Sequence, residues 1–136
     1  MKRVLIIIIA NFLFALEIGK INWFRDYNKA IEIAKKQHKI ILVDISKHEC
    51  PPCIYMEKKV YSDIKLAMYI KKNFVPLFYY ADIDKIPFFH IGEYFTEVAP
   101  SILFIDIDGN LIYRIIGPRP PKEFLKILKK IKDGHG

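Results

Sequence analysis

The chain has 136 residues, of which 52% are hydrophobic, and its ten Phe and eight Tyr supply enough apolar surface for one folded core. This length and composition exclude both a two-domain protein and an intrinsically disordered one. The formal charge of +7 is modest, and the lysine-rich segment 126–132 contains no aromatic residue that could stack on bases, so we expect a solvated helix face and no nucleic-acid site.

The N-terminus has the pattern of a secretory signal peptide. Two basic residues precede an apolar run over residues 4–16. As a helix of thirteen residues this run would reach only ~20 Å, which is short of the ~30 Å hydrocarbon core of a membrane. We therefore expect residues 1–15, or up to residue 19, to be a cleaved leader. An uncleaved membrane anchor facing the periplasm is the alternative, and 20–133 is the expected folded domain.

The first elements after the leader are a helix and a strand. Apolar residues at Tyr27, Ala30 and Ala34 follow helical spacing, which predicts an amphipathic helix over residues 26–38. The apolar run that follows, over 40–45, is rich in β-branched residues, as is typical of a central strand covered on both faces. Asp44 is the anomaly within this strand.

Two cysteines and a second strand come next. Cys50 and Cys53 directly precede a segment without Gly or Pro, which predicts a helix that opens at the cysteines. Ser62-Asp63 is a plausible N-cap for a further helix over 64–72. Residues 74–80 read as a strand in which Pro76 is tolerable only at an edge or an irregularity.

The C-terminal half ends in a hairpin and a helix. A long connection over 82–99 carries an aromatic cluster, for which we favour a small satellite core over a substrate-facing rim. Asp108-Gly109-Asn110 separates two apolar runs and predicts an antiparallel hairpin. The order of elements predicts an α/β protein with a central mixed sheet flanked by helices on both faces. The aromatic cluster consists of Phe88, Phe89, His90, Tyr94 and Phe95.

Cys50 and Cys53 are the only cysteines, and three roles are open to them. As a structural staple they would close a very short loop, for which chain entropy gives only ~1.9 kcal/mol. A closed zinc site needs about four ligands, and the nearest additional ligand is His48. Reversible dithiol-disulfide exchange fits best, because a helix N-terminus stabilises the Cys50 thiolate.

The residues next to the cysteines modify that chemistry. Pro51 suits a first helical turn, and Pro52 stiffens the loop between the two sulfurs. Glu49 would oppose a nearby thiolate, whereas Lys47 and a protonated His48 would favour it. Asp44, from its position alone, is either a carboxylate escaping at a strand end or a buried acid that relays protons.

Together these residues resemble the thioredoxin superfamily, and in particular thioredoxin-like proteins similar to the C-terminal domain of the bacterial transmembrane disulfide reductase. The resemblance covers roughly residues 22–132. It is carried by Trp23, Ala30, Ala34, Ile41-Leu42-Val43-Asp44, Cys50-Pro51-Pro52-Cys53, Met56-Glu57, Val60, Ser62, Asp63, Phe74-Val75, Ala99-Pro100-Ser101 and Asp108-Gly109.

The resemblance implies a thioredoxin fold and a role for each site residue. Cys50 would be the exposed nucleophile and Cys53 the thiol that resolves the mixed disulfide. Asp44 would be the buried acid. Pro100 would be a cis-proline facing the active site, where the Ala99 backbone pairs with a bound substrate chain.

The function expected from the sequence is that of an exported, periplasmic thiol-disulfide oxidoreductase, reductive or carrier rather than primarily oxidising. It would need no cofactor besides the redox-active Cys50–Cys53 disulfide and no metal. Pro51, Pro52, Ala99 and Pro100 would contact protein thiol or disulfide substrates. A redox partner protein, for which a membrane electron donor is one candidate, and a monomeric state complete the expectation. The alternative function is a copper or zinc metallochaperone that uses the cysteine pair and His48.

Overall fold

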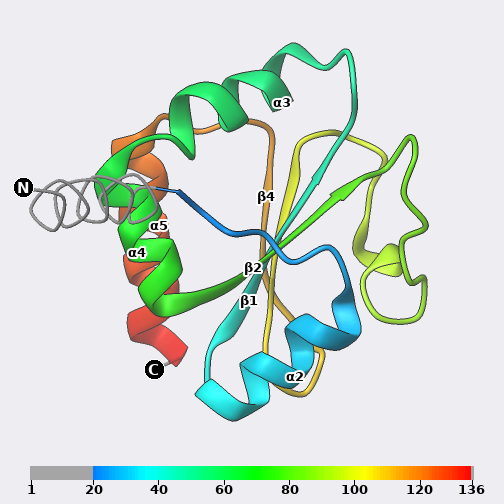
Figure 1. The fold of residues 1–136 in the computed structure, drawn as a ribbon, viewed down its shortest axis with the longest axis vertical. Helices are drawn as coiled ribbons and strands as arrows, with labels where there is room; N and C mark the ends of the chain where they lie inside the picture. Colours follow the sequence, from blue (N-terminus) through cyan, green and yellow to red (C-terminus); the bar gives the residue numbers. More distant parts are fainter. Residues whose placement is uncertain (1–19, 136) are drawn as a thin grey trace, which may run out of the picture.

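The computed structural model describes residues 20–135 (Figure 1). The leader expected at residues 1–15 or 1–19 therefore lies outside the described residues. Within residues 20–135, no helix combines the length and apolar character needed to span a membrane.

Four strands form one mixed sheet. The strands are β1 (Ile40–Ser46), β2 (Phe74–Tyr80), β3 (Ser101–Ile105) and β4 (Leu111–Ile116), in the spatial order β2-β1-β3-β4. β1 is parallel to β2, whereas β3 is antiparallel to both β1 and β4. The predicted strand at 40–45 and the predicted hairpin are confirmed, and β1 is one of the two inner strands.

Helices cover both faces of the sheet, as the sequence predicted. α2 (Tyr27–Gln37) lies against one face, and α4 (Ile64–Asn73) and α5 (Pro121–His135) lie against the other (Figure 1). Alternate β1 side chains enter the two apolar clusters: Ile41 and Val43 pack on the α2 side, and Leu42 packs on the α4–α5 side. This two-sided packing explains why every residue of β1 is buried.

Pro76 lies in the edge strand β2, which is one of the two settings that the sequence allowed for it. Its carbonyl oxygen accepts a hydrogen bond of 2.8 Å from the Phe24 backbone N–H, and the Phe78 N–H donates to the Phe24 carbonyl at 2.9 Å. These bonds show that the Pro76 backbone faces outward from the sheet. The missing N–H therefore removes no bond to β1.

The segment after the cysteines is helical but irregular. α3 (Pro51–Tyr55) continues into a π-helical turn, η1 (Met56–Val60), which the sequence did not predict. α4 begins where expected, because the Asp63 side chain accepts a hydrogen bond of 3.0 Å from the Leu66 N–H.

The first hairpin strand is shorter than the apolar pattern suggested. β3 ends at Ile105 instead of reaching residue 107. The Asp106 side chain accepts hydrogen bonds of 2.9 Å from the backbone N–H groups of both Asp108 and Asn110. The turn therefore begins at Asp106, because its carboxylate holds the backbone in a loop conformation.

The expectation of a satellite core in the connection 82–99 is half wrong. Tyr94 and Phe95 do pack against the cluster on the α2 side. Phe88 and Phe89, however, are 63% and 86% exposed. The N–H groups at 90–92 all donate to the Pro87 carbonyl, and the tight turn that results buries Ile91 and leaves the two phenylalanines outside.

Candidate active site

The cysteines lie where β1 passes into α3. β1 ends at Ser46, and Cys50 is the N-cap residue of α3, with an extended backbone at φ −116° and ψ 101°. Between them Glu49 has φ 54°, in the left-handed region that non-glycine residues seldom adopt. A buried central strand and a helix therefore fix the two ends of the loop that carries Cys50.

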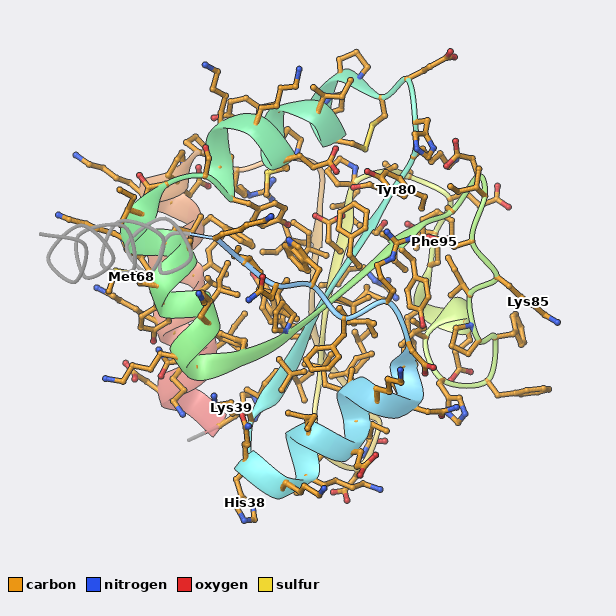
Figure 2. All side chains as sticks on the ribbon, in the orientation of Figure 1. His38, Lys39, Met68, Tyr80, Lys85 and Phe95 are labelled. Atoms are coloured by element: carbon orange, nitrogen blue, oxygen red, sulfur yellow. A yellow bond between two sulfur atoms is a disulfide. The ribbon has the colours of Figure 1, made fainter. Side chains whose placement is uncertain are left out.

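The two sulfur atoms are bonded to each other and differ in exposure. Cys50 and Cys53 form a disulfide with their Cα atoms 5.2 Å apart, visible as a yellow bond in Figure 2. Cys50 is partly exposed, whereas Cys53 is fully buried. An incoming thiol or disulfide can therefore reach Cys50 and not Cys53.

The prolines limit the hydrogen-bond donors around Cys50. Pro51 and Pro52 occupy the first two helical positions and have no N–H group. The Cys53 N–H donates to Sγ of Cys50 at 3.3 Å, and the next N–H, of Ile54, is used by the Cys50 carbonyl oxygen at 3.0 Å. A Cys50 thiolate would thus receive one backbone donor from this helix.

Lys47 and His48 of the loop are both bound to other groups. Nζ of Lys47 donates to the Glu97 carbonyl at 3.1 Å. The His48 ring stacks on Tyr80 with centroids 4.1 Å apart, and its Nδ1 lies 3.0 Å from an Asp82 carboxylate oxygen. Partial desolvation raises the pKa of Asp82, but hydrogen bonds from the His48 backbone and ring outweigh it and lower that pKa overall.

Ala99 and Pro100 lie opposite the cysteines, as the resemblance implied. The peptide bond between them is cis, and Pro100 is buried just before β3. The carbonyl oxygen of Ala99 is 3.8 Å from Sγ of Cys50. Ala99 itself is partly exposed.

Asp44 is a fully buried acid and does not escape at a strand end. Its two carboxylate oxygens accept hydrogen bonds from Ser46 Oγ, at 2.6 Å, and from the Tyr61 hydroxyl. Its pKa is raised to about 6: burial has the largest effect, the bonds from Ser46 and Tyr61 act against it, and the Glu57 charge adds to it. Burial and the Asp44 charge likewise hold the pKa of Tyr61 well above its ordinary value.

Sequence reasoning did not assign Ser46 or Tyr61 to this buried acid. Ser46 carried a signal, because residues two apart in a strand point to the same face. No signal in the sequence indicated Tyr61, which follows a π-helical turn and bonds to Asp44 from that position.

A cavity of about 420 Å³ opens on the far side of Tyr61. The Tyr80 hydroxyl, on a residue labelled in Figure 2, donates to Glu57 in its wall at 2.8 Å. Burial and this bond to Glu57 raise the pKa of Tyr80 to about 12. Tyr61 therefore separates Asp44 from a cavity with a polar wall. The cavity is lined by Lys20, Ile21, Trp23, Arg25, Glu57, Tyr61, Ser62, Phe78 and Tyr80.

Metal binding finds no support in this geometry. Over residues 20–135, no three His, Cys, Asp or Glu residues are grouped so that they could hold an ion. The hypothesis of a metallochaperone needed His48 beside the cysteines, and the His48 ring is instead paired with Asp82.

Comparison with known proteins agrees with this architecture. Residues 27–132 match the thioredoxin-like domain family. Thioredoxin H5 of Arabidopsis thaliana is 25% identical over 103 residues, which are 76% of this chain and 80% of that protein. A putative disulphide-isomerase from Bacteroides thetaiotaomicron has 27% identity and a TM-score of 0.68, over 81% of this chain and 91% of that one.

The chain belongs to the thioredoxin-like domain family, and its fold is the thioredoxin fold. With its Cys-x-x-Cys disulfide, it is a thiol-disulfide oxidoreductase. The oxidised C-terminal domain of DsbD from Neisseria meningitidis shares the fold, with a TM-score of 0.62 and 18% identity over 80% of this chain and 98% of that one.

The raised pKa of Asp44 predicts a specific pH dependence of stability. Because the native pKa of about 6 exceeds the ordinary 3.8, the folded state binds more protons at Asp44 between these values, so the contribution of Asp44 to stability is fully present below pH ~4 and is lost as the pH rises through 6. Two pKa units correspond to ~3 kcal/mol. Urea unfolding of the oxidised protein should therefore show Asp44→Asn gaining ~3 kcal/mol relative to the wild type between pH 4 and pH 8.

Asp108→Asn is the matched control, because it removes an exposed carboxylate from the hairpin turn. Its stability relative to the wild type should change much less over the same pH range. A pH-independent difference between Asp44→Asn and the wild type would contradict the raised pKa.

Proposed function

We propose that this oxidoreductase is exported and passes electrons to protein disulfides, as a reductant or carrier, through Cys50 and Cys53. One observation carries the proposal: Cys50, a partly exposed residue at a helix N-terminus whose sulfur accepts one N–H donor, is bonded to the buried Cys53. Such asymmetry assigns the two cysteines different roles, attack and resolution.

In the reduced protein the Cys50 thiolate attacks one sulfur of a substrate disulfide. The other substrate sulfur leaves with the bonding electron pair and takes a proton from solvent, and a mixed disulfide with Cys50 remains. The Cys53 thiol, deprotonated by Asp44, then attacks Sγ of Cys50. The bond between Cys50 and the substrate sulfur breaks, and that sulfur leaves with the electron pair and takes a second proton from solvent, while Asp44 releases the Cys53 proton to solvent. The substrate is then a dithiol, Cys50 and Cys53 form a disulfide, and two electrons have moved to the substrate.

The substrate chain would lie across the exposed edge of the site. The backbone of Ala99, whose carbonyl is 3.8 Å from Sγ of Cys50, would pair with the extended substrate. Pro51 and Pro52, which are exposed and partly exposed, would form an apolar surface beside the reacting sulfurs, and the buried Pro100 would hold Ala99 in place.

A reductive role follows from the poor stabilisation of the thiolate. A couple becomes strongly oxidising when its reduced form is stabilised. Here two prolines remove two potential donors, and Lys47 and His48 are bound to Glu97 and Asp82. The reduced form therefore gains little stabilisation of its Cys50 thiolate, which favours a reducing couple. A redox partner would supply the electrons, and a membrane donor is the proposed source.

Substitution of each cysteine tests the catalytic assignment. Reduction of insulin disulfides should fall to background in Cys50→Ser, because the nucleophile is lost. Cys53→Ser should accumulate mixed disulfides with substrate, since Cys50 attacks but nothing resolves the product; non-reducing electrophoresis detects them. Unchanged activity in Cys50→Ser would refute the assignment.

Export is tested by fractionation and mass. In a bacterial host the protein should be recovered from the periplasm with an intact mass that corresponds to cleavage after Ala15. A periplasm-facing protein of full mass in the membrane fraction would indicate the uncleaved anchor. Recovery from the cytoplasm would contradict export in either form.

A further inference from the structure

A depression of about 370 Å³ lies on the outer side of α3 and η1, and its wall includes Pro51, the residue that follows Cys50. Its position follows from helical spacing. Pro51, Ile54, Tyr55 and Lys58 stand at i, i+3, i+4 and i+7 and so share one helix face. Pro51 follows Cys50 in the chain, so this helix face begins at the residue next to Cys50. We call this surface the α3 shelf; it is lined by Pro51, Ile54, Tyr55, Lys58 and Lys59.

The α3 shelf is the solvent side of a helix whose other side is core. Cys53, Met56 and Val60 are fully buried. Ile54 and Tyr55, by contrast, are 40% and 37% exposed. The chain thus presents two large apolar side chains within about one helical turn of its nucleophile.

The shelf is also positively charged at its far end. Within residues 20–135, neither Lys58 nor Lys59 forms an ion pair. The adjacent acid, Glu57, is held by the Tyr80 hydroxyl at 2.8 Å in the wall of the other cavity. The two ammonium groups are therefore available to an acidic ligand.

We propose that the α3 shelf binds the stretch of a substrate polypeptide next to its reacting cysteine and selects an apolar residue followed by acidic residues. The inference rests on the proposed function and names its substrate class. The apolar side chain would lie on Ile54 and Tyr55, and the acidic side chains would face Lys58 and Lys59. Ala99 would hold the substrate backbone on the other side of Cys50.

Three peptides test this preference, each with one cysteine in a mixed disulfide with thionitrobenzoate. The cysteine is followed by Leu-Asp-Asp, Leu-Lys-Lys or Ser-Asp-Asp. The Cys50 thiolate attacks the peptide sulfur, because thionitrobenzoate is the better leaving group, and its release is measured by absorbance. We expect the wild type to react about tenfold faster with Leu-Asp-Asp than with Leu-Lys-Lys, and several-fold faster than with Ser-Asp-Asp.

Two shelf variants and one control locate the effect. The double variant Lys58→Glu/Lys59→Glu should invert the preference between acidic and basic peptides, and Ile54→Ser should remove the advantage of Leu over Ser. The control Lys35→Glu/Lys36→Glu makes the same charge change on α2, at the opposite end of the molecule from α3 (Figure 1), and should leave both preferences intact. High salt, at ~1 M, should reduce the charge preference because it screens exposed charges.

Hydroxyethyl disulfide, which is small and neutral, separates substrate recognition from an effect on Cys50 itself. Its reaction rate should stay within about twofold of the wild type in every variant. If this rate falls as much as the peptide rates in Lys58→Glu/Lys59→Glu, the lysines act on the thiolate and the inference is wrong. Equal wild-type rates for all three peptides also refute the shelf but not the proposed function. Failure to react with any disulfide refutes the proposed function.

Discussion

The hydrogen bond from the Cys53 N–H to Sγ of Cys50 is the interaction on which the chemistry of this protein depends. It exists because Cys50 occupies the N-cap of α3, where a side chain accepts from the third helical residue. Pro51 and Pro52 leave it as the one backbone donor that this helix offers to the sulfur. The fold holds the geometry rigid, since the strand that enters the loop is buried along its whole length.

The second constraint is the acid buried in β1, the strand that leads to the cysteines. A carboxyl group inside an apolar sheet is tolerable when its polar atoms are satisfied, and Ser46 and Tyr61 supply one donor to each oxygen of Asp44. The remaining burial still favours the protonated form, so Asp44 changes charge near pH 6. In our proposal it is this group that accepts the proton of Cys53.

Local patterns in the sequence predicted most of the fold. The alternation of β1 between two cores, the edge position of Pro76 and the N-cap at Asp63 all follow from short-range rules, and the structure confirms them. The cysteine pair and the helix N-terminus were equally readable, because their spacing alone restricts the chemistry. The placement of Ala99 beside Cys50 came from resemblance, since no local rule joins residues so far apart.

The features that the sequence could not reveal depend on tertiary geometry. Tyr61 directly follows the π-helical turn η1 and bonds to Asp44, and no pattern in the sequence predicts that turn. The phenylalanines of the long connection were expected inside, but one tight turn at Pro87 buries Ile91 in their place. The α3 shelf also depends on tertiary structure, because the fold decides that Ile54 and Tyr55 are exposed in the same depression as Lys58 and Lys59.

The reduction potential of the Cys50–Cys53 couple tests the central claim most directly. It can be measured by equilibrating the protein in buffers with known ratios of reduced to oxidised glutathione and determining the oxidised fraction of the protein by alkylation of free thiols. One weak donor to the thiolate predicts a reducing couple, between ~−220 and ~−270 mV. A value near ~−120 mV, typical of a dedicated oxidant, would contradict the account, because it would require a strongly stabilised Cys50 thiolate.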